Sequence, residues 1–138
     1  MATFFFMEFV AWATHKYIMH GFLWNLHQDH HVVDKNKIFQ KNDYFFLIFA
    51  IPSIVLMYYG FSNMSVEFFI GLGILFYGIA YFLVHEVIIH RRLPPPSKTK
   101  SKYIKAIRKA HKIHHKNLGK QNGVNFGMLI VPKKYFKS

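Results

Sequence analysis

Long apolar runs dominate the first two thirds of the chain, and short polar stretches separate them. Residues 45–84 contain no Lys, Arg or His, and their only formal charge is Glu67, beside a polar stretch at 62–65. Two apolar arms joined by such a turn predict a membrane hairpin, because about 20 apolar residues cross the ~30 Å hydrocarbon layer. We expect its spans at about 44–61 and 68–89.

A third apolar run, residues 2–13, includes Glu8. It can cross a membrane only as a span of about 2–24, with its histidines turned inward, and we expect this helix to lack its first turns here. A signal peptide is not expected, because no basic segment precedes the run and no small-residue cleavage site follows it. All 18 Lys and Arg lie outside the hairpin. The positive-inside rule therefore predicts that both hairpin ends face the cytoplasm, with every histidine near that face.

The chain changes character after the hairpin. Residues 93–97 read Leu-Pro-Pro-Pro-Ser and predict an extended connector, because proline cannot continue a helix. An amphipathic helix is expected at about 103–118, with its histidines continuing the apolar side. Its opposite face carries five lysines: Lys102, Lys105, Lys109, Lys112 and Lys116. Such a face is typical of contact with solvent or lipid headgroups, and docking of a reductase is the alternative.

Composition narrows the class of protein. The chain is 52% hydrophobic and 19% aromatic with a formal net charge of +12, so apolar and basic regions must be segregated. Its 16 Phe and 8 Tyr exclude a disordered chain. The absence of cysteine excludes disulfides, iron–sulfur ligands and cysteine nucleophiles. We expect one domain, residues 1–138: an all-α integral membrane bundle of about three to four spans with a cytoplasmic histidine-rich cap. No nucleic-acid partner is expected.

The ten histidines fall into four clusters, two open and two tight. The clusters are, in order, His15 and His20; His27, His30 and His31; His85 and His90; and His111, His114 and His115. The i, i+3 and i+4 positions of a tight cluster lie within about 100° on one helical face, so three imidazoles can converge on one place. Positions i and i+5 of an open cluster are about 140° apart on an α-helix. They either flank a groove or need a local distortion to meet one ion.

The alternation of open and tight clusters predicts two metal ions in one bundle. Imidazole suits iron, zinc, copper and nickel, and ten nitrogens are about enough for two ions with a place left for oxygen or water. Because imidazole is a neutral ligand, Asp29, Glu86 and Glu8 are expected as partners of the imidazole N–H groups. A single interfacial histidine is more often a packing or capping residue. Ten in four patterned clusters, with none elsewhere, favour metal binding.

These clusters resemble the histidine boxes of the membrane fatty acid hydroxylase and desaturase superfamily. The strings around them are similar, more closely, to its bacterial β-carotene 3-hydroxylase family, and the similarity covers nearly the whole chain. The hairpin turn differs in detail. The strings that carry the resemblance are residues 6–24, 29–31, 42–43, 85–92, 103–116 and 126–132.

The resemblance implies a non-haem di-iron centre on the ten histidines and no further catalytic residue. It implies O2-dependent hydroxylation at C3 of a β-ionone ring, giving β-cryptoxanthin and then zeaxanthin from a carotenoid dissolved in the bilayer. A multi-pass protein of the bacterial cytoplasmic membrane is implied, with electrons from a ferredoxin-type carrier. The chain agrees with an external reductant, because it has neither cysteine for a cluster nor a Gly-x-Gly-x-x-Gly motif for a nucleotide cofactor. Its lysine face suits an acidic carrier.

Two other functions stay open at this point. A sterol or fatty-acyl hydroxylase of the same superfamily would be expected to have a longer chain and different strings between the boxes. A non-enzymatic metal carrier or sensor would more often place histidines or carboxylates in the middle of a span. The hairpin has no such residue before Glu67 at its turn.

Overall fold

The computed structural model describes residues 2–32, 39–93 and 100–136, which form helices, turns and coil. The α-helices are α1 (Ala2–Ala13), α2 (Trp24–His31), α3 (Tyr44–Gly60), α4 (Val66–Phe82) and α5 (Lys102–His114). Two π-helical stretches, η1 (Thr14–Phe22) and η3 (Leu83–Ile89), continue α1 and α4, and short 3-10 turns are η2 (Lys41–Asp43) and η4 (Lys133–Tyr135). Since these residues contain no strand, the expectation of an all-helical protein is confirmed for them.

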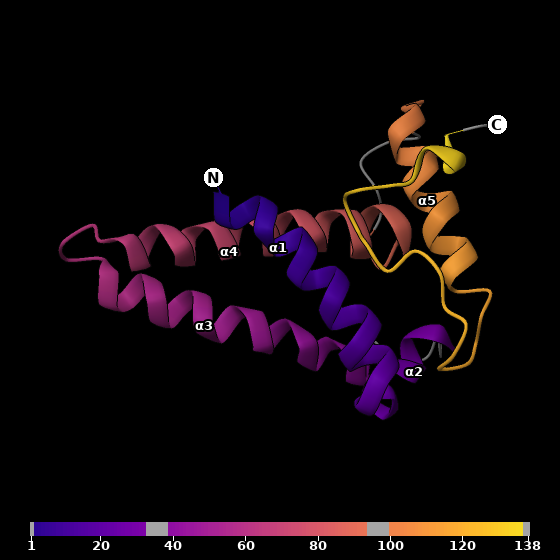
Figure 1. The fold of residues 1–138 in the computed structure, drawn as a ribbon, viewed down its shortest axis with the longest axis horizontal. Helices are drawn as coiled ribbons and strands as arrows, with labels where there is room; N and C mark the ends of the chain where they lie inside the picture. Colours follow the sequence, from indigo (N-terminus) through magenta and orange to yellow (C-terminus); the bar gives the residue numbers. More distant parts are fainter. Residues whose placement is uncertain (1, 33–38, 94–99, 137–138) are drawn as a thin grey trace.

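Helices α3 and α4 form a long antiparallel hairpin that extends away from the other elements (Figure 1). The stretches Lys41–Gly60 and Val66–Ile89 are the two described helices long and apolar enough to cross a membrane. Only 17% and 22% of them is buried, and large exposed apolar surfaces of this kind mark contact with lipid or a partner rather than a soluble core. The helical stretches run over residues 44–60 and 66–89, where the sequence predicted membrane spans at about 44–61 and 68–89.

Small residues let the helices approach one another closely. A Cβ atom added to Gly71 would lie 2.7 Å from the carbonyl oxygen of Ser53, and the Ser53 hydroxyl donates to the Gly71 carbonyl at 2.8 Å. A Cβ atom added to Gly73 would lie 2.7 Å from Cβ of Thr3. Helix α1 therefore packs directly on α4, and it runs obliquely across the hairpin toward α2 (Figure 1).

The region expected as a first span, residues 2–24, is divided in the structure. Helix α1 continues into η1, but Gly21 has non-helical backbone angles (φ −101°, ψ −125°), so the chain turns there before α2 begins. Thr14, His15 and His20 in η1 are polar and buried. The sequence predicted three to four spans. In the described ranges, two helices meet the length and hydropathy requirement for crossing a membrane.

Helix α5 begins at a capping serine and ends earlier than expected. The backbone N–H of Ile104 donates to the Ser101 hydroxyl at 3.4 Å. The helix ends at His114, and a turn at His115 and Lys116 replaces the predicted continuation to Leu118. The chain from 117 to 132 then returns as coil past the end of α4 (Figure 1). Of the predicted extended connector 93–97, all but Leu93 lies outside the residues described.

Candidate metal centre

The structure brings all four histidine clusters together at the end of the hairpin opposite its turn. Nine histidines, five plus four, divide into two groups in which the ligand nitrogens lie within 4.8 Å of one another. The first group contains His15, His20, His27, His31 and His114. The second group contains His30, His85, His90 and His111. Each group draws on three helical elements, and α5 lies far along the sequence from the others in the first group.

The spacing of each tight cluster predicted that its three imidazoles converge on one place. Instead, both tight clusters are divided between the two groups. His27 and His31 of α2 lie in the first group, whereas His30 lies in the second. Helix α5 divides in the same way, with His114 in the first group and His111 in the second. On an α-helix, positions i and i+4 are only about 40° apart, while i+3 lies about 60° to the other side. A helix placed between two sites therefore serves both.

Both open clusters lie where the helix becomes π-helical. His15 and His20 lie within η1, and His85 lies in η3 with His90 directly after it. The backbone N–H of His90 donates to the carbonyl of His85 at 2.9 Å, which is the i→i+5 bond of a π-helix. This wider turn brings residues five apart to one side, so the ring centroids are 5.2 Å apart for His15 and His20 and 4.5 Å for His85 and His90. Of the two alternatives for an open cluster, the local distortion is the one found.

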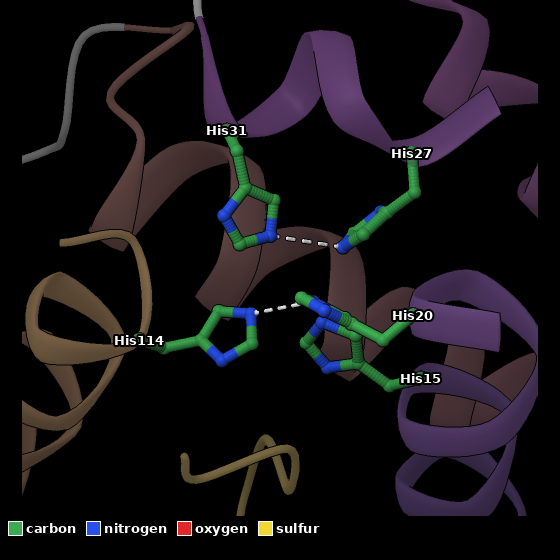
Figure 2. Close-up of side chains that lie close together, drawn as sticks. All are labelled: His15, His20, His27, His31 and His114. Atoms are coloured by element: carbon green, nitrogen blue, oxygen red, sulfur yellow. Dashed lines mark hydrogen bonds between the residues drawn. The ribbon is translucent and has the colours of Figure 1, made fainter. Parts of the chain in front are cut away.

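The inner nitrogens of the imidazoles converge at metal-ligand spacing. In the first group, Figure 2 shows five rings pointing toward one another from η1, α2 and α5. The Nε2 atoms of His27 and His31 are 3.2 Å apart, as are those of His20 and His114. In the second group, the Nε2 atoms are 3.1 Å apart for His30 with His85 and 2.9 Å apart for His90 with His111. Two nitrogens held ~2.1 Å from one ion at right angles are about 3.0 Å apart, so the spacing fits ligands of a common ion.

In seven histidines the outer nitrogen, Nδ1, donates a hydrogen bond to an oxygen. The acceptors are the carbonyls of Phe126 for His15 (3.0 Å), Lys120 for His20 (3.0 Å), Asn117 for His31 (3.0 Å) and Val124 for His114 (2.8 Å), and the side chains of Asn42 for His27 (2.6 Å), Gln40 for His30 (2.9 Å) and Glu86 for His85 (2.6 Å). Because these oxygens can only accept, Nδ1 carries the proton and Nε2 keeps a lone pair toward the centre. This is the arrangement that metal-binding histidines adopt.

Burial favours the neutral form of the histidines in α2 and α5 and of His90. Desolvation lowers the pKa of His27 to about 3 and that of His31 to about 4, and neighbouring histidines add to both shifts. Burial also lowers the pKa of His114 and of His90 to about 3. Metal ligands must be deprotonated, so the folded chain presents its ligands at pH 7 in the form that binds a metal.

His115 lies between the two groups and belongs to neither by nitrogen distance. Its ring stacks on His31 at 4.5 Å with an interplanar angle of 17° and lies 4.4 Å from the ring of His111. The Nε2 atoms of His115 and of His15 are buried and have no hydrogen-bond partner among the residues described. A buried lone pair facing other imidazoles fits a metal ligand, so the donor set as a whole suits a metal.

Glu86 is the predicted carboxylate that lies against a histidine. It accepts from Nδ1 of His85 at 2.6 Å and from Arg92 at 2.9 Å. Asp29 has a different partner, since it accepts from the backbone N–H of Lys41 at 2.6 Å. The other oxygen of Asp29 is buried and has no hydrogen-bond partner within the described ranges.

Glu8 has partners other than the imidazole that the sequence suggested. One of its oxygens accepts three backbone N–H groups, each at 2.9 Å, from Met128, Leu129 and Ile130. Its other oxygen accepts from the Tyr77 hydroxyl at 2.6 Å. Glu8 therefore fixes the coil that follows α5, and the carbonyls of Val124 and Phe126 in that coil hold His114 and His15. Its effect on the first group is indirect.

Sequence reasoning missed six of the seven acceptors. Gln40 and Asn42 are polar residues just before an apolar helix, a pattern that also marks an ordinary helix start. The four backbone carbonyls leave no signal in the sequence, because every residue has one. An asparagine and a glutamine two residues apart, next to a histidine-rich region, were the available clue.

A cavity of about 640 Å³ opens beside the second group. Its lining contains four histidines with Ile89 and four basic residues: His31, His90, His111 and His115, and Lys105, Arg108, Lys109 and Lys112. Three of the five lysines of the predicted face therefore line this cavity, whereas Lys102 and Lys116 do not. The basic face and the histidines share one opening.

An all-helical fold with an apolar hairpin long enough to cross a membrane, and with paired groups of buried histidines that could hold metal ions, is typical of membrane metal-binding proteins. The chain belongs to the fatty acid hydroxylase family, whose sequence profile, described as "Fatty acid hydroxylase", matches residues 1–136.

Curated relatives narrow the similarity further. The chain is 40% identical to the "Beta-carotene hydroxylase" of Pantoea ananas over 126 residues, which cover 91% of this chain and 71% of the relative. It is 38% identical to that of Pseudescherichia vulneris over 127 residues (92% and 72%). "Beta-carotene 3-hydroxylase 2, chloroplastic" of Arabidopsis thaliana is 37% identical over 132 residues (93% and 43%), so the chain spans less than half of this plant relative. No solved structure shows significant similarity to the chain.

Proposed function

We propose that this chain hydroxylates β-carotene at C3 of its β-ionone ring, giving β-cryptoxanthin and then zeaxanthin, with O2 as co-substrate. The observation that carries the proposal is the convergence of histidine Nε2 atoms in two buried groups at the end of an apolar hairpin. Relatives named as β-carotene hydroxylases, at up to 40% identity over most of the chain, support the carotenoid substrate.

The two groups are proposed to hold two non-haem iron ions. His15, His20, His27, His31 and His114 would bind the first, and His30, His85, His90 and His111 the second, with His115 available between them. When bound, the ions supply with O2 the oxidising power that an unactivated ring C–H bond requires. The protein holds seven of these imidazoles in one tautomer through the acceptor on Nδ1, and burial keeps solvent from the inner nitrogens. Glu86 supplies the negative charge nearest to these neutral ligands.

An acidic electron carrier such as ferredoxin is proposed to dock at the lysine face. Electrons must come from outside the chain, which has no cysteine and no nucleotide-binding glycine motif. The cavity lined by Lys105, Arg108, Lys109 and Lys112 opens directly onto His90 and His111. A carrier held there would lie close to the second group, and complementary charge would orient it.

We further propose that the protein is a multi-pass protein of the bacterial cytoplasmic membrane, with the histidine end facing the cytoplasm. The turn at 61–65 has no Lys or Arg, and the outward side chains of α3 and α4 are apolar. A carotenoid is a rod comparable in length with the ~30 Å bilayer core. Lying across the membrane, it would present its ring near the interface, where the histidines gather.

Membrane orientation is tested with single cysteines, because the chain has none of its own. Ser62→Cys at the hairpin turn should be labelled only from outside, and Lys102→Cys only from the cytoplasmic side. Labelling of both positions from the cytoplasmic side would contradict the orientation.

The reaction is tested in a bacterium that accumulates β-carotene, supplied with isotopically labelled O2. The chain should produce β-cryptoxanthin and zeaxanthin whose hydroxyl oxygen carries the label, and a His111→Ala variant should produce neither. Unchanged β-carotene, despite intact protein, iron and a competent reductase, would favour a sterol or fatty-acyl hydroxylase. Hydroxyl oxygen derived from water would exclude the oxygenase reaction.

A further inference from the structure

The outer hydrogen bonds of the two groups differ in charge. In the first group, four backbone carbonyls and the Asn42 amide, all neutral, accept from Nδ1. In the second group, His30 donates to the Gln40 amide and His85 to the Glu86 carboxylate. Among the described residues, Glu86 is the carboxylate found on an imidazole of either group.

Arg92 connects Gln40 and Glu86, the two residues that accept hydrogen bonds from histidines of the second group. Its Nη1 atom donates to Oε2 of Glu86 at 2.9 Å and to Oδ1 of Asp43 at 2.8 Å, and its Nη2 atom donates to Oδ2 of Asp43 at 2.9 Å. Oδ2 of Asp43 also accepts the backbone N–H of Gln40 at 3.0 Å. One guanidinium therefore holds Glu86 directly and Gln40 through Asp43.

These contacts form a closed ring that returns to its starting point. It passes from His30 to Gln40, Asp43, Arg92, Glu86 and His85, and it closes across the Nε2 atoms of His85 and His30, which are 3.1 Å apart. Its members come from α2, from η2 and the residue before it, from η3 and from the residues just after η3. The ring therefore joins three segments that enclose the second group.

The charged side chains of the ring are partly exposed to solvent, and Glu86 is the least exposed of the three. The Glu86 side chain is 12% exposed, and those of Arg92 and Asp43 are 27% and 31% exposed. The planar guanidinium forks onto both oxygens of Asp43, which a lysine ammonium cannot do. A substitution at Arg92 would leave Glu86 without its counter-charge and Asp43 free to rotate away from Gln40.

We propose that Arg92 is a positioning residue of the second group, which sets the orientation of His85 and His30 through Glu86 and Gln40. The inference rests on the metal centre proposed above and adds that the two groups are unequal. The metal affinity of the second group depends on a charged ring, and that of the first group does not.

The test is cobalt binding by the full-length, metal-free protein in detergent, followed through the visible absorption of the bound ion. We expect two binding phases in the unsubstituted chain. His111→Ala should remove the phase of the second group and His114→Ala the phase of the first, which assigns them. Arg92→Gln should weaken the second-group phase by about 10–100-fold and leave the first unchanged. Arg92→Lys, which keeps the charge but not the fork, should give a smaller loss in the same phase.

Arg91→Gln is the matched control, because Arg91 is the exposed neighbour of Arg92, and it should leave both phases unchanged. Equal weakening of both phases by Arg92→Lys, or no effect of Arg92→Gln on either, would overturn the inference. So would absence of two cobalt phases in the unsubstituted chain. Carotenoid turnover plays no part in this readout, so failure of the proposed hydroxylation with both cobalt phases intact would be recognised separately.

Discussion

The two histidine groups use the same ligand type but are completed by different parts of the molecule. Four imidazoles of the first group are held by carbonyls of the coil 117–126, far along the chain from most of the ligands. The second group is held by the charged ring around Arg92. The first site therefore depends on closure of the coil over the bundle, and the second depends on a local network of side chains.

Removing one ligand from each group should give the largest effect. His114→Ala and His111→Ala should each lower the bound metal from two ions per chain to one and abolish turnover, because both imidazoles are buried within their groups. Metal analysis and pigment chromatography measure the two outcomes. Lys105→Ala and Lys109→Ala should keep both ions and weaken reduction in a salt-dependent way. Full activity with two ions in both histidine variants would disprove the two groups.

Removing the Glu8 carboxylate should disturb the first group selectively. Glu8→Ala leaves three backbone N–H groups of the coil without their acceptor, at a cost of roughly 2–5 kcal/mol in the free energy of unfolding. The coil then holds His15 and His114 less firmly, and the first-group cobalt phase should weaken more than the second. Glu67→Gln, at the exposed turn of the hairpin, is the control and should change neither phase. Equal weakening of both phases would show that closure of the coil is not specific to the first group.

Gln40 and Asn42 allow the sharpest comparison, because two residues of one short segment serve different groups. Gln40 accepts from His30 in the second group, and Asn42 accepts from His27 in the first. Gln40→Ala should therefore weaken the second-group phase and Asn42→Ala the first, each by about tenfold. Cobalt titration of both variants measures which of the two binding phases each substitution weakens. If each variant weakened both phases alike, the pair would act only as the start of α3.

Lowering the pH should give the smallest difference between the two groups, because it acts on the histidines of both. The pKa values of His114 in the first group and His90 in the second are both lowered to about 3, whereas an unfolded chain protonates histidine near 6.5. Between these values the unfolded state binds more protons, so stability falls as pH falls, by up to about 1.4 kcal/mol per pH unit for each such histidine. Unfolding of metal-free protein from pH 7 to 5 measures it. Stability that rises toward pH 5 would contradict the neutral imidazoles.

Much of this architecture could be predicted from the order of residues. The stretch 45–84, which has no Lys, Arg or His, defines the hairpin, and four histidine clusters that flank it must meet when it folds back. The division of histidines between groups could not be predicted, because one helical face does not reveal that α2 lies between two sites. The role of Glu8 could not be predicted either, because its partners in the coil are backbone N–H groups at residues 128–130. Helix α5 stops at His114 because the following coil turns back, a tertiary effect that helical periodicity does not contain.

The π-helical stretch η3 makes the number of residues between His85 and His90 as important as their identity. Inserting one residue there, for example after Val87, with helical winding kept would rotate everything after it by about 100° relative to α4. His90 would turn away from His111, and Arg92 would leave Glu86. The turn at 61–65, by contrast, lies at the far end of the hairpin and should accept insertions. The number of residues within η3 is therefore constrained separately from their identity, and insertion scanning would detect this constraint even at positions where every single substitution is tolerated.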